Sequence, residues 1–545
     1  MSRYNYQRRL TTPVNVGGVI IGGDSPVRVQ SMTNTNTLDT EASAAQVRRI
    51  ADAGGEIVRL TTQGVAEAEN MARISAMVRE GGCDVPLVAD VHFNPKAAYA
   101  AAKACQKVRI NPGNFVDAAR TFRKLTFTDE EYAEEIARIR KALVPFLDIC
   151  RQHATAVRLG VNHGSLSDRI MSRYGDTPAG MVESVMEFLR ICGEENFHDI
   201  VISIKASNVV VMVETVRLLV EEMRKENMAY PIHLGVTEAG DGEDGRVKSA
   251  VGIGTLLSEG IGDTIRVSLS EAPENEIPVA MALRDYISAR GAHAPIVEPE
   301  ATFPAPARSA AERRHGFGQT AWPLVIGYDI ELPEGAVEKI DSSEPVRQVD
   351  GKVIELTSSH ANPVGEIQSW LERYRIAGGV APVVVTLKYD DSDPDLVRLK
   401  AAADFGAILL NGYGNALRLV APVLTREESD ALLLGILQAA RLRFSKTDYI
   451  ACPSCGRTLF DLPATLAEVR EATKHLKGLK IGVMGCIVNG PGEMADADYG
   501  YVGAGVGRVS LYKGKNLIIK NIPTAEALPA LIDLLKSNGD WKDPE

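Results

Sequence analysis

Long hydrophobic runs are missing from this 545-residue sequence. A membrane-spanning helix needs roughly 20 consecutive apolar residues, and no run of the chain approaches that length. The first residues, Met1–Arg9, are basic, but no apolar segment follows them as it would in a secretory signal peptide. The sequence therefore predicts a cytoplasmic protein without a membrane partner.

Cysteine is scarce as well, with 7 residues in the whole chain. They are odd in number and lie far apart, so no disulfide framework is expected and a reducing compartment fits. Small thiols in helix-like stretches usually serve as packing residues. Four cysteines have this character: Cys83, Cys105, Cys150 and Cys192.

Basic residues are fewer than acidic residues in this chain. The chain has 60 Lys and Arg against 71 Asp and Glu, which gives a formal net charge of −11. Nucleic acids and anionic membranes are bound by basic surfaces, so neither is expected as the main partner. The length also exceeds that of one ordinary domain, and two or three domains are predicted.

The remaining three cysteines lie close together near the C-terminus. Cys452 and Cys455 are separated by two residues, and Cys486 precedes a Gly-Pro-Gly turn. A structural zinc site normally has four Cys or His ligands, and here the nearest fourth candidate is Glu493, directly after that turn. Three thiolates and an exchangeable carboxylate favour an iron-sulfur cluster in which one iron can exchange its ligand for a substrate.

Two alternatives to the cluster remain open from spacing alone. A Cys-x2-Cys pair also serves zinc, so a zinc ribbon could combine the three cysteines with His475. The thiols could also be uninvolved in metal binding. The spacing favours the cluster without excluding either alternative.

Short β-branched runs alternate with longer helical patterns over the first 290 residues. Eight such runs in about 260 residues are typical of a (β/α)8 TIM barrel, whose short parallel strands are buried on both faces. The helices between them are amphipathic, as in Glu41–Ala53. The predicted strands are Val27–Gln30, Ile57–Leu60, Val85–Val88, Val108–Ile110, Val157–Leu159, Ile200–Ile204, Ile232–Leu234 and Thr264–Val267.

Cationic side chains interrupt or end five of these apolar runs. A buried cation without a partner is costly, so five in equivalent places imply either a shared anionic ligand or internal ion pairs. Guanidinium groups match phosphate oxygens well, which favours a phosphate-rich small molecule at the carboxyl ends of the strands. The five are Arg59, Arg109, Arg158, Lys205 and Arg266, with the polar residues Asn111, Asn162, Ser207, Thr237, Glu238 and Ser268 nearby.

Three residues of this region are candidates for chemistry. Lys205 could form a Schiff base as in aldolases, although pairing with phosphate fits better among so many cations. His92 follows the third strand and could act as a general acid or as a neutral hydrogen-bond donor. Glu238 is the acidic group expected inside the site as a proton donor, or alternatively as the neutralising partner of an arginine.

The middle of the chain, residues 291–428, predicts a separate α/β module without a catalytic constellation. A Pro/Ala/Glu-rich linker reaches about Ala307, and the module is expected to be structural. Its predicted strands are Trp322–Ile326, Pro382–Leu387 and Ala407–Gly412, and its predicted helices are Pro363–Tyr374 and Asp393–Ala403.

The C-terminal region, residues 429–545, predicts a small α+β domain that carries the three cysteines. Glu427–Arg443 reads as an amphipathic helix leading into it, and the strand Lys480–Met484 delivers Cys486. The remaining expected elements are helices at Thr465–Lys477 and Thr524–Ser537, a hairpin through Lys513–Lys515 and a glycine-rich turn at Gly503–Gly507.

Barrel, cationic strand ends and cysteine module together resemble the 4-hydroxy-3-methylbut-2-enyl diphosphate synthase family of the non-mevalonate isoprenoid pathway. The resemblance covers residues 1 to about 290 and 429 to 545, with long motifs in the same order. The motifs are Val29–Thr35, Val88–Phe93, Arg109–Asn114, Leu234–Gly240, Leu257–Thr264, Cys452–Arg457 and Gly485–Glu493.

The resemblance implies a cofactor, a substrate and roles for particular residues. The family's 4Fe-4S cluster has three cysteines and a glutamate as ligands, which correspond to Cys452, Cys455, Cys486 and Glu493. The implied substrate is 2-C-methyl-D-erythritol 2,4-cyclodiphosphate, reductively opened with loss of water by two electrons from ferredoxin or flavodoxin. Diphosphate contacts are implied for Arg59, His92, Arg109, Asn111, Arg158, Asn162, Lys205, Arg266 and Ser268, while Thr237 and Glu238 face the reacting carbons.

The middle module departs from the short bacterial form of this family and resembles the insert of longer, plant-like versions. In the short form a homodimer lets the cluster domain of one chain cap the barrel of the other. With the insert, both ends of one chain could meet, so a monomer and a homodimer both remain open. Competing hypotheses are a zinc-stabilised aldolase that uses Lys205 and an iron-sensing or scaffold protein, although no nucleic-acid-binding surface is evident.

Overall fold

The computed structural model describes residues 2–116, 126–300, 322–333, 335–487, 490–494 and 496–544. Residues 301–307 of the predicted linker lie outside these residues. The chain forms two compact units. One contains Leu10–Gly245, Gly262–Ala280 and Lys446–Glu545, and the other contains Met1–Arg9, Arg246–Ile261 and Met281–Ser445.

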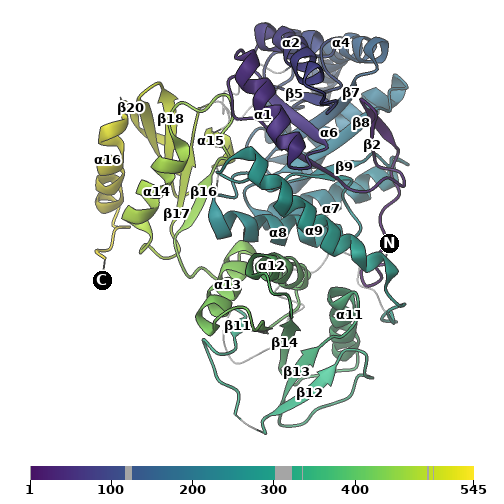
Figure 1. Ribbon diagram of the computed structural model, residues 1–545, viewed down its shortest axis with the longest axis vertical. Helices are drawn as coiled ribbons and strands as arrows, with labels where there is room; N and C mark the ends of the chain where they lie inside the picture. The colour runs from purple at the N-terminus through teal and green to yellow at the C-terminus, as the bar shows by residue number, and fades with distance from the viewer. Residues whose placement is uncertain are drawn as a thin grey trace. The chain divides into compact units, whose positions relative to one another are not determined.

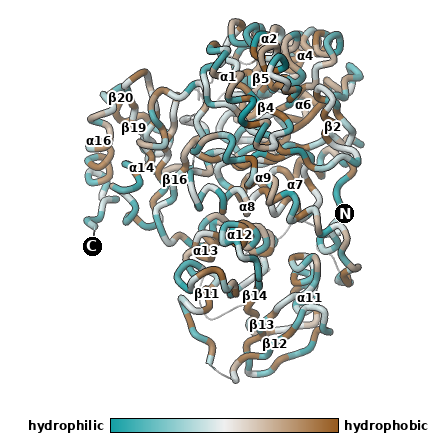
Figure 2. The backbone as a smooth tube through the Cα atoms, in the orientation of Figure 1, coloured by the Kyte–Doolittle hydropathy of each residue, from teal (hydrophilic) through white to brown (hydrophobic). Residues whose placement is uncertain are grey.

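Eight parallel strands of the first unit form a closed barrel (Figure 1), which confirms the predicted TIM barrel. Each of the eight predicted runs overlaps a barrel strand, because β-branched residues suit strands that are buried on both faces, although several bounds differ by one to three residues. Apolar positions, brown in Figure 2, run through the strands near β4 and β5. The strands are β3 (Arg28–Met32), β4 (Ile57–Thr62), β5 (Leu87–Val91), β6 (Lys107–Ile110), β7 (Ala156–Asn162), β8 (Ile200–Lys205), β9 (Ile232–Leu234) and β10 (Thr264–Ile265).

Helices connect successive barrel strands, as the right-handed βαβ rule requires. Several begin at a side-chain cap, as where Thr128 and Glu131 form a reciprocal capping box. The hairpin of β1 (Val14–Val16) and β2 (Val19–Ile21) packs its apolar residues against the barrel core. The helices are α1 (Thr40–Asp52), α2 (Val65–Glu80), α3 (Pro95–Ala101), α4 (Asp129–His153), α5 (Asp168–Tyr174), α6 (Pro178–Glu194), α7 (Val209–Lys225), α8 (Gly242–Ser258) and α9 (Glu276–Ser288), followed by a 3-10 turn at Ala289–Ala292.

The C-terminal α+β domain belongs to the same compact unit as the barrel. Its five-stranded sheet has the order β16, β17, β18, β19, β20. β19 pairs antiparallel with β20, and the hairpin predicted through Lys513–Lys515 is closed by the pair Lys513 and Asn516. The predicted strand Lys480–Met484 and final helix are confirmed with the same bounds. The elements are β16 (Asp448–Ala451), α14 (Leu462–Thr473), β17 (Lys480–Met484), α15 (Gly490–Glu493), β18 (Tyr499–Gly505), β19 (Arg508–Lys513), β20 (Asn516–Pro523) and α16 (Thr524–Ser537).

The second unit has a five-stranded parallel sheet with the order β11, β15, β14, β13, β12. The expected α/β module is therefore present in residues 322–445. Its elements are β11 (Leu324–Val325), β12 (Val337–Asp341), β13 (Val353–Thr357), α11 (Pro363–Ile376), β14 (Val383–Lys388), α12 (Pro394–Leu410), β15 (Ala416–Val420) and α13 (Arg426–Ala439).

The predicted strand Ala407–Gly412 is wrong, because these residues end α12 and enter the following turn. A helix that is apolar on all sides looks like a buried strand in sequence. Here α12 is buried on nearly its whole circumference, and a Cβ at Gly406 would lie 2.9 Å from the Cα of Val251 on α8. None of the described helices is long and apolar enough to cross a membrane.

A buried polar cluster holds α9 and α12 together within the second unit. Asp404 of α12 forms an ion pair with Arg290 and accepts hydrogen bonds from Tyr286 at 2.5 Å and Tyr389 at 2.8 Å. Neither charged side chain is more than 2% exposed. A buried carboxylate is stable only with such partners, so this cluster fixes how α12 packs in the unit.

Candidate functional site

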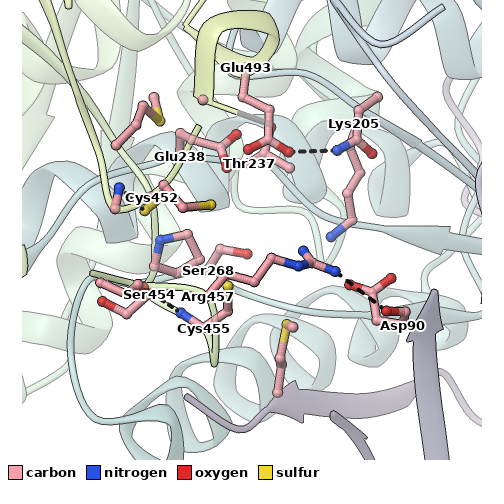
Figure 3. A pocket seen from close by; sticks show the side chains of 18 of the residues that line it. Asp90, Lys205, Thr237, Glu238, Ser268, Cys452, Ser454, Cys455, Arg457 and Glu493 are labelled. Atoms are coloured by element: carbon pink, nitrogen blue, oxygen red, sulfur yellow. Dashed lines mark hydrogen bonds between the residues drawn. The ribbon is translucent and has the colours of Figure 1, made fainter. Parts of the chain in front are cut away.

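A pocket lies at the carboxyl ends of the barrel strands and is lined from the other side by the cysteine-bearing loops of the C-terminal domain (Figure 3). All of its lining residues belong to one compact unit of one chain. It gathers most of the residues predicted from the sequence: Arg59, His92, Arg109, Asn162, Lys205, Thr237, Glu238, Arg266, Ser268, Cys452, Cys455, Cys486 and Glu493.

Three predicted residues, Asn111, Arg158 and Ser207, do not line this pocket. Asn111 follows β6 and accepts a hydrogen bond from the Gly113 backbone N–H at 3.0 Å, so it shapes the loop. Arg158 is 1% exposed on β7, and all three of its guanidinium nitrogens lack a hydrogen-bond partner among the described residues. An unpaired buried guanidinium is costly, which fits a place beneath an anionic ligand.

Asp90 on β5 also lines the pocket, although the sequence alone does not predict it. It accepts a hydrogen bond from Arg109 Nη1 at 3.0 Å and lies 3.9 Å from Arg59 Nε. Burial alone raises the pKa of Asp90, but these two arginines outweigh it and hold the pKa well below its usual range. A carboxylate two residues before His92 in a buried strand was the available signal.

Internal ion pairs account for only some of the five cationic side chains predicted at the strand ends. Arg266 is paired with Glu276 through two hydrogen bonds of 2.8 Å, and Asp90 serves Arg59 and Arg109. No carboxylate of the described chain forms an ion pair with Arg158 or Lys205. Internal ion pairs therefore account for Arg59, Arg109 and Arg266, while the shared anionic ligand stays a prediction for Arg158 and Lys205.

Two basic side chains of the pocket, His92 and Lys205, have environments that disfavour their protonated forms. Burial, followed by the charge of Arg109, lowers the pKa of His92 well below its usual value, so the imidazole is neutral. Burial and the charges of Arg59 and Arg158 lower the pKa of Lys205 in the same way. Among the two roles considered for His92, these shifts favour the neutral hydrogen-bond donor.

The three cysteines reach the pocket from two neighbouring strands of the C-terminal sheet. Cys452 directly follows β16, and Cys486 follows β17, so the parallel pairing of these strands brings both thiols to one edge. Cys455 follows a tight turn in which Ser454 has φ of 63°. The Gly485 backbone N–H donates to Cys452 Sγ at 3.3 Å, a contact that stabilises a thiolate.

The site has the donors of a metal centre but not the geometry of a single-ion site. Among the described residues, no three His, Cys, Asp or Glu side chains converge on one metal ion. His475, the fourth ligand of the zinc alternative, instead contacts the Lys542 carbonyl oxygen at 2.7 Å and packs against Trp541. It does not line the pocket with the cysteines.

Glu493 lies at the end of α15 and points into the pocket beside Thr237 and Glu238 (Figure 3). Its carboxylate accepts a hydrogen bond from Asn162 Nδ2 at 2.6 Å. Glu238 is buried with φ of 52°, a conformation rarely adopted by residues other than glycine. Burial, followed by the nearby charge of Glu493, raises the pKa of Glu238 well above its usual value, so Glu238 retains its proton.

Comparison with known families gives matches at both ends of the chain. Residues 11–281 match the GcpE TIM-barrel domain, and residues 448–537 match the GcpE protein C-terminal domain. The chain belongs to the GcpE family. The two matches contain every pocket residue named above.

Full-length relatives extend the match to the middle region. The chain is 51% identical to the 4-hydroxy-3-methylbut-2-en-1-yl diphosphate synthase (flavodoxin) of Parabacteroides distasonis, with 99% of this chain and 100% of that protein covered. It is 52% identical to the protein of the same name from Bacteroides fragilis, with coverage of 100% and 98%. For that of Akkermansia muciniphila the identity is 43%, with coverage of 100% and 99%. These GcpE relatives therefore share the inserted module.

Proposed function

We propose that the chain catalyses the reductive ring opening and dehydration of 2-C-methyl-D-erythritol 2,4-cyclodiphosphate to 4-hydroxy-3-methylbut-2-enyl diphosphate. The observation that carries this proposal is the pocket itself, in which a ring of cations from the barrel faces three thiols and Glu493. The names of the full-length GcpE relatives support the same reaction. In this proposal residues 1–290 bind the substrate, 291–428 are a structural insert and 429–545 carry the cofactor.

The donor set of the pocket fits a 4Fe-4S cluster. Cys452, Cys455 and Cys486 would supply thiolates, and Glu493 would supply the fourth, exchangeable ligand. The hydrogen bond from Gly485 to the Cys452 sulfur suits a cluster thiolate. Such a cluster supplies electrons and a Lewis-acidic iron when it is bound.

The barrel residues would bind and orient the diphosphate. Arg59 and Arg109 present guanidinium groups and Lys205 presents its amine to the pocket, while Arg158 is buried and its guanidinium has no hydrogen-bond partner among the described residues. Planar guanidinium groups bind phosphate oxygens through paired hydrogen bonds, so they fix orientation as well as charge. Arg266, Asn111, Asn162 and Ser268 complete the proposed substrate-binding set.

Glu238 would supply the proton that the departing hydroxyl requires. Its raised pKa keeps a proton on the carboxyl group at neutral pH, as a general acid needs. Glu238 Oε2 is buried and has no hydrogen-bond partner in the described chain, so it is available to a substrate oxygen. Thr237 lies beside it, and neutral His92 would donate a hydrogen bond rather than a proton.

The electron donor would be flavodoxin, the carrier named for the full-length relatives, with ferredoxin as the alternative. Two electrons are needed per turnover, and both carriers deliver them singly. One chain supplies both halves of the pocket, so a monomer would suffice for catalysis. The expected location is the cytoplasm, where such carriers are found.

The decisive experiment measures iron, acid-labile sulfide and zinc in protein purified without oxygen. About four irons and four sulfides per chain, with turnover of the cyclic diphosphate by reduced flavodoxin, are the expected results. Stoichiometric zinc without sulfide, persisting after reconstitution with iron and sulfide, would contradict the proposal.

One observation favours an aldolase as a second candidate. The lowered pKa of Lys205 is what a Schiff-base lysine requires. Borohydride would then trap a carbonyl substrate on Lys205, whereas the reductive mechanism predicts no trapping.

A further inference from the structure

We propose that Asn162 is a positioning residue that links the cationic pocket to the Glu493 carboxylate and competes with the metal for it. This inference rests on the proposed function, because it gives Asn162 a role toward the fourth ligand of the cluster. The contacts run from Asp90 through Arg109 and Asn162 to Glu493. They join the barrel to the turn that bears Glu493.

The orientation of the Asn162 amide is fixed from the barrel side. Arg109 Nη2 donates to Asn162 Oδ1 at 3.0 Å, so the amide oxygen is already used. An amide has donors on one branch and an acceptor on the other. Asn162 Nδ2 is thereby directed at Glu493 Oε1, 2.6 Å away.

Arg109 is itself held in place by several hydrogen bonds, so it can fix the orientation of the Asn162 amide. Its Nη2 also donates to the Gly160 carbonyl at 2.9 Å, and its Nη1 donates to Asp90 at 3.0 Å. A Cβ at Gly160 would lie only 2.4 Å from Arg109 Nε, so the absence of a side chain there makes room for the guanidinium. The position of Asn162 therefore depends on the same arginine that faces the anion site.

The turn that carries Glu493 is also seated on the barrel. Gly164, just after β7, and Gly492 touch backbone to backbone, and a Cβ at Gly164 would lie 2.1 Å from the Gly492 carbonyl oxygen. Ser207 Oγ donates to the Glu493 carbonyl oxygen at 3.2 Å. The barrel therefore contacts this turn at two points of Glu493, because Ser207 donates to its backbone carbonyl oxygen and Asn162 donates to its carboxylate.

The arrangement gives Glu493 two competing partners. A hydrogen bond from Asn162 draws the carboxylate toward the barrel, and coordination to iron would draw it toward the cysteines. Hydrogen bonds to charged groups are about twice as strong as those between neutral groups. Asn162 would therefore raise the fraction of protein in which the iron position is free for another ligand.

Cyanide is a suitable probe, because it binds an iron that has a free position and its binding changes the electron paramagnetic resonance spectrum of a reduced cluster. The experiment measures the cyanide Kd by spectral titration of full-length, anaerobically reconstituted, one-electron-reduced protein. In Asn162→Ala the Kd is expected to rise about ten-fold, as for the loss of a hydrogen bond to a charged group. An unchanged Kd at equal cluster content would overturn the proposal.

Further variants separate the Asn162 contact from general effects. Asn162→Asp keeps the side-chain size but places a second carboxylate beside Glu493, so the cyanide Kd should rise. This variant provides the test if Asn162→Ala does not assemble a cluster. Asn70→Ala is the matched control, since Asn70 is a buried amide of α2 whose Oδ1 accepts from Thr40 and whose Nδ2 donates to the Thr37 carbonyl oxygen at 2.8 Å, and it does not line the pocket. Its cyanide Kd should equal that of the unmodified protein, and an equal rise in both alanine variants would contradict a specific role of Asn162.

A double-mutant comparison tests the coupling itself. In Glu493→Gln the uncharged amide is a poor iron ligand, so adding Asn162→Ala should leave the cyanide Kd unchanged. A ten-fold rise in that background would show that Asn162 acts without Glu493 and would refute the link. Absence of iron and sulfide from the unmodified protein would instead count against the proposed function, which keeps the two failures distinct.

Discussion

Asp90 is the residue whose removal tests the charge balance of the pocket. Asp90→Asn leaves Arg59 and Arg109 buried without their carboxylate, so the free energy of unfolding should fall by about 3 kcal/mol. Pyrophosphate should restore part of this loss, because its charge replaces that of the carboxylate. Chemical denaturation with and without pyrophosphate measures both effects, and a variant as stable as the unmodified protein would contradict this account.

Lys205 predicts a pH dependence of anion binding. Burial and the neighbouring arginines lower the pKa of Lys205 in the free protein, and a bound diphosphate would raise that pKa again. Binding of pyrophosphate should therefore take up a proton, and the affinity should fall as pH rises from the lowered free pKa toward the bound value.

Calorimetry in two buffers of different ionisation enthalpy measures this proton uptake. The variant Lys205→Met should bind pyrophosphate more weakly and take up fewer protons. Equal uptake by both proteins would show that another group titrates.

The sequence predicted the cationic and thiol residues of the site better than the carboxylates that pair with the arginines. The five cations and three thiols were recognised because they interrupt apolar runs or follow metal-binding spacings. Asp90 and Glu276 were missed, since their arginine partners lie elsewhere in the chain. The register of β5 and β6 pairs Asp90 with Arg109, and the first residue of α9 brings Glu276 to Arg266. The position of Arg158 outside the pocket lining likewise depends on how deep its side chain sits in the barrel.

The buried Asp404 on α12 allows a direct test of what stabilises the second unit. Asp404→Ala removes the carboxylate that Arg290, Tyr286 and Tyr389 share, and leaves a buried cation unpaired. We expect a loss of about 3 kcal/mol or more in the free energy of unfolding of the second unit. Asp395→Ala on the same helix is the control, because that side chain is 81% exposed and its ion pair with Arg398 is a surface one. Equal losses in thermal or denaturant unfolding would contradict the role given to the buried cluster.

Helices and strands could be distinguished from the sequence where the hydrophobic pattern matched either the strand period or the helix period, but not both. The barrel strands are short, β-branched and bounded by turns, so their assignment succeeded. The run Ala407–Gly412 failed because α12 is apolar on every side, and length was the only clue left. In the same module β12, β13 and β15 were missed, since charged residues such as Lys339, Glu355 and Arg418 alternate within them and hide the apolar face.

For the whole molecule, the sequence predicted a barrel and a cysteine domain but not that one compact unit contains both. That grouping depends on contacts between distant segments, such as the hydrogen bond from Ser270 Oγ to the Cys452 carbonyl oxygen at 2.9 Å. Parts of α8 and α9 belong instead with the middle module, so the compact units cut through helices that the sequence assigns wholly to the barrel.

The pocket within one chain predicts that two differently inactivated chains will not rescue each other. Arg109→Ala would disable the barrel side, and Cys486→Ser would disable the cysteine side. If each site forms from one chain, an equimolar mixture should be as inactive as the separate variants. If barrel and cysteine domain came from different subunits of a homodimer, mixed dimers would contain one intact site and recover about a quarter of the activity. The turnover rate after co-expression and joint reconstitution decides between these outcomes, and recovery would show that the active assembly exchanges its domains between chains.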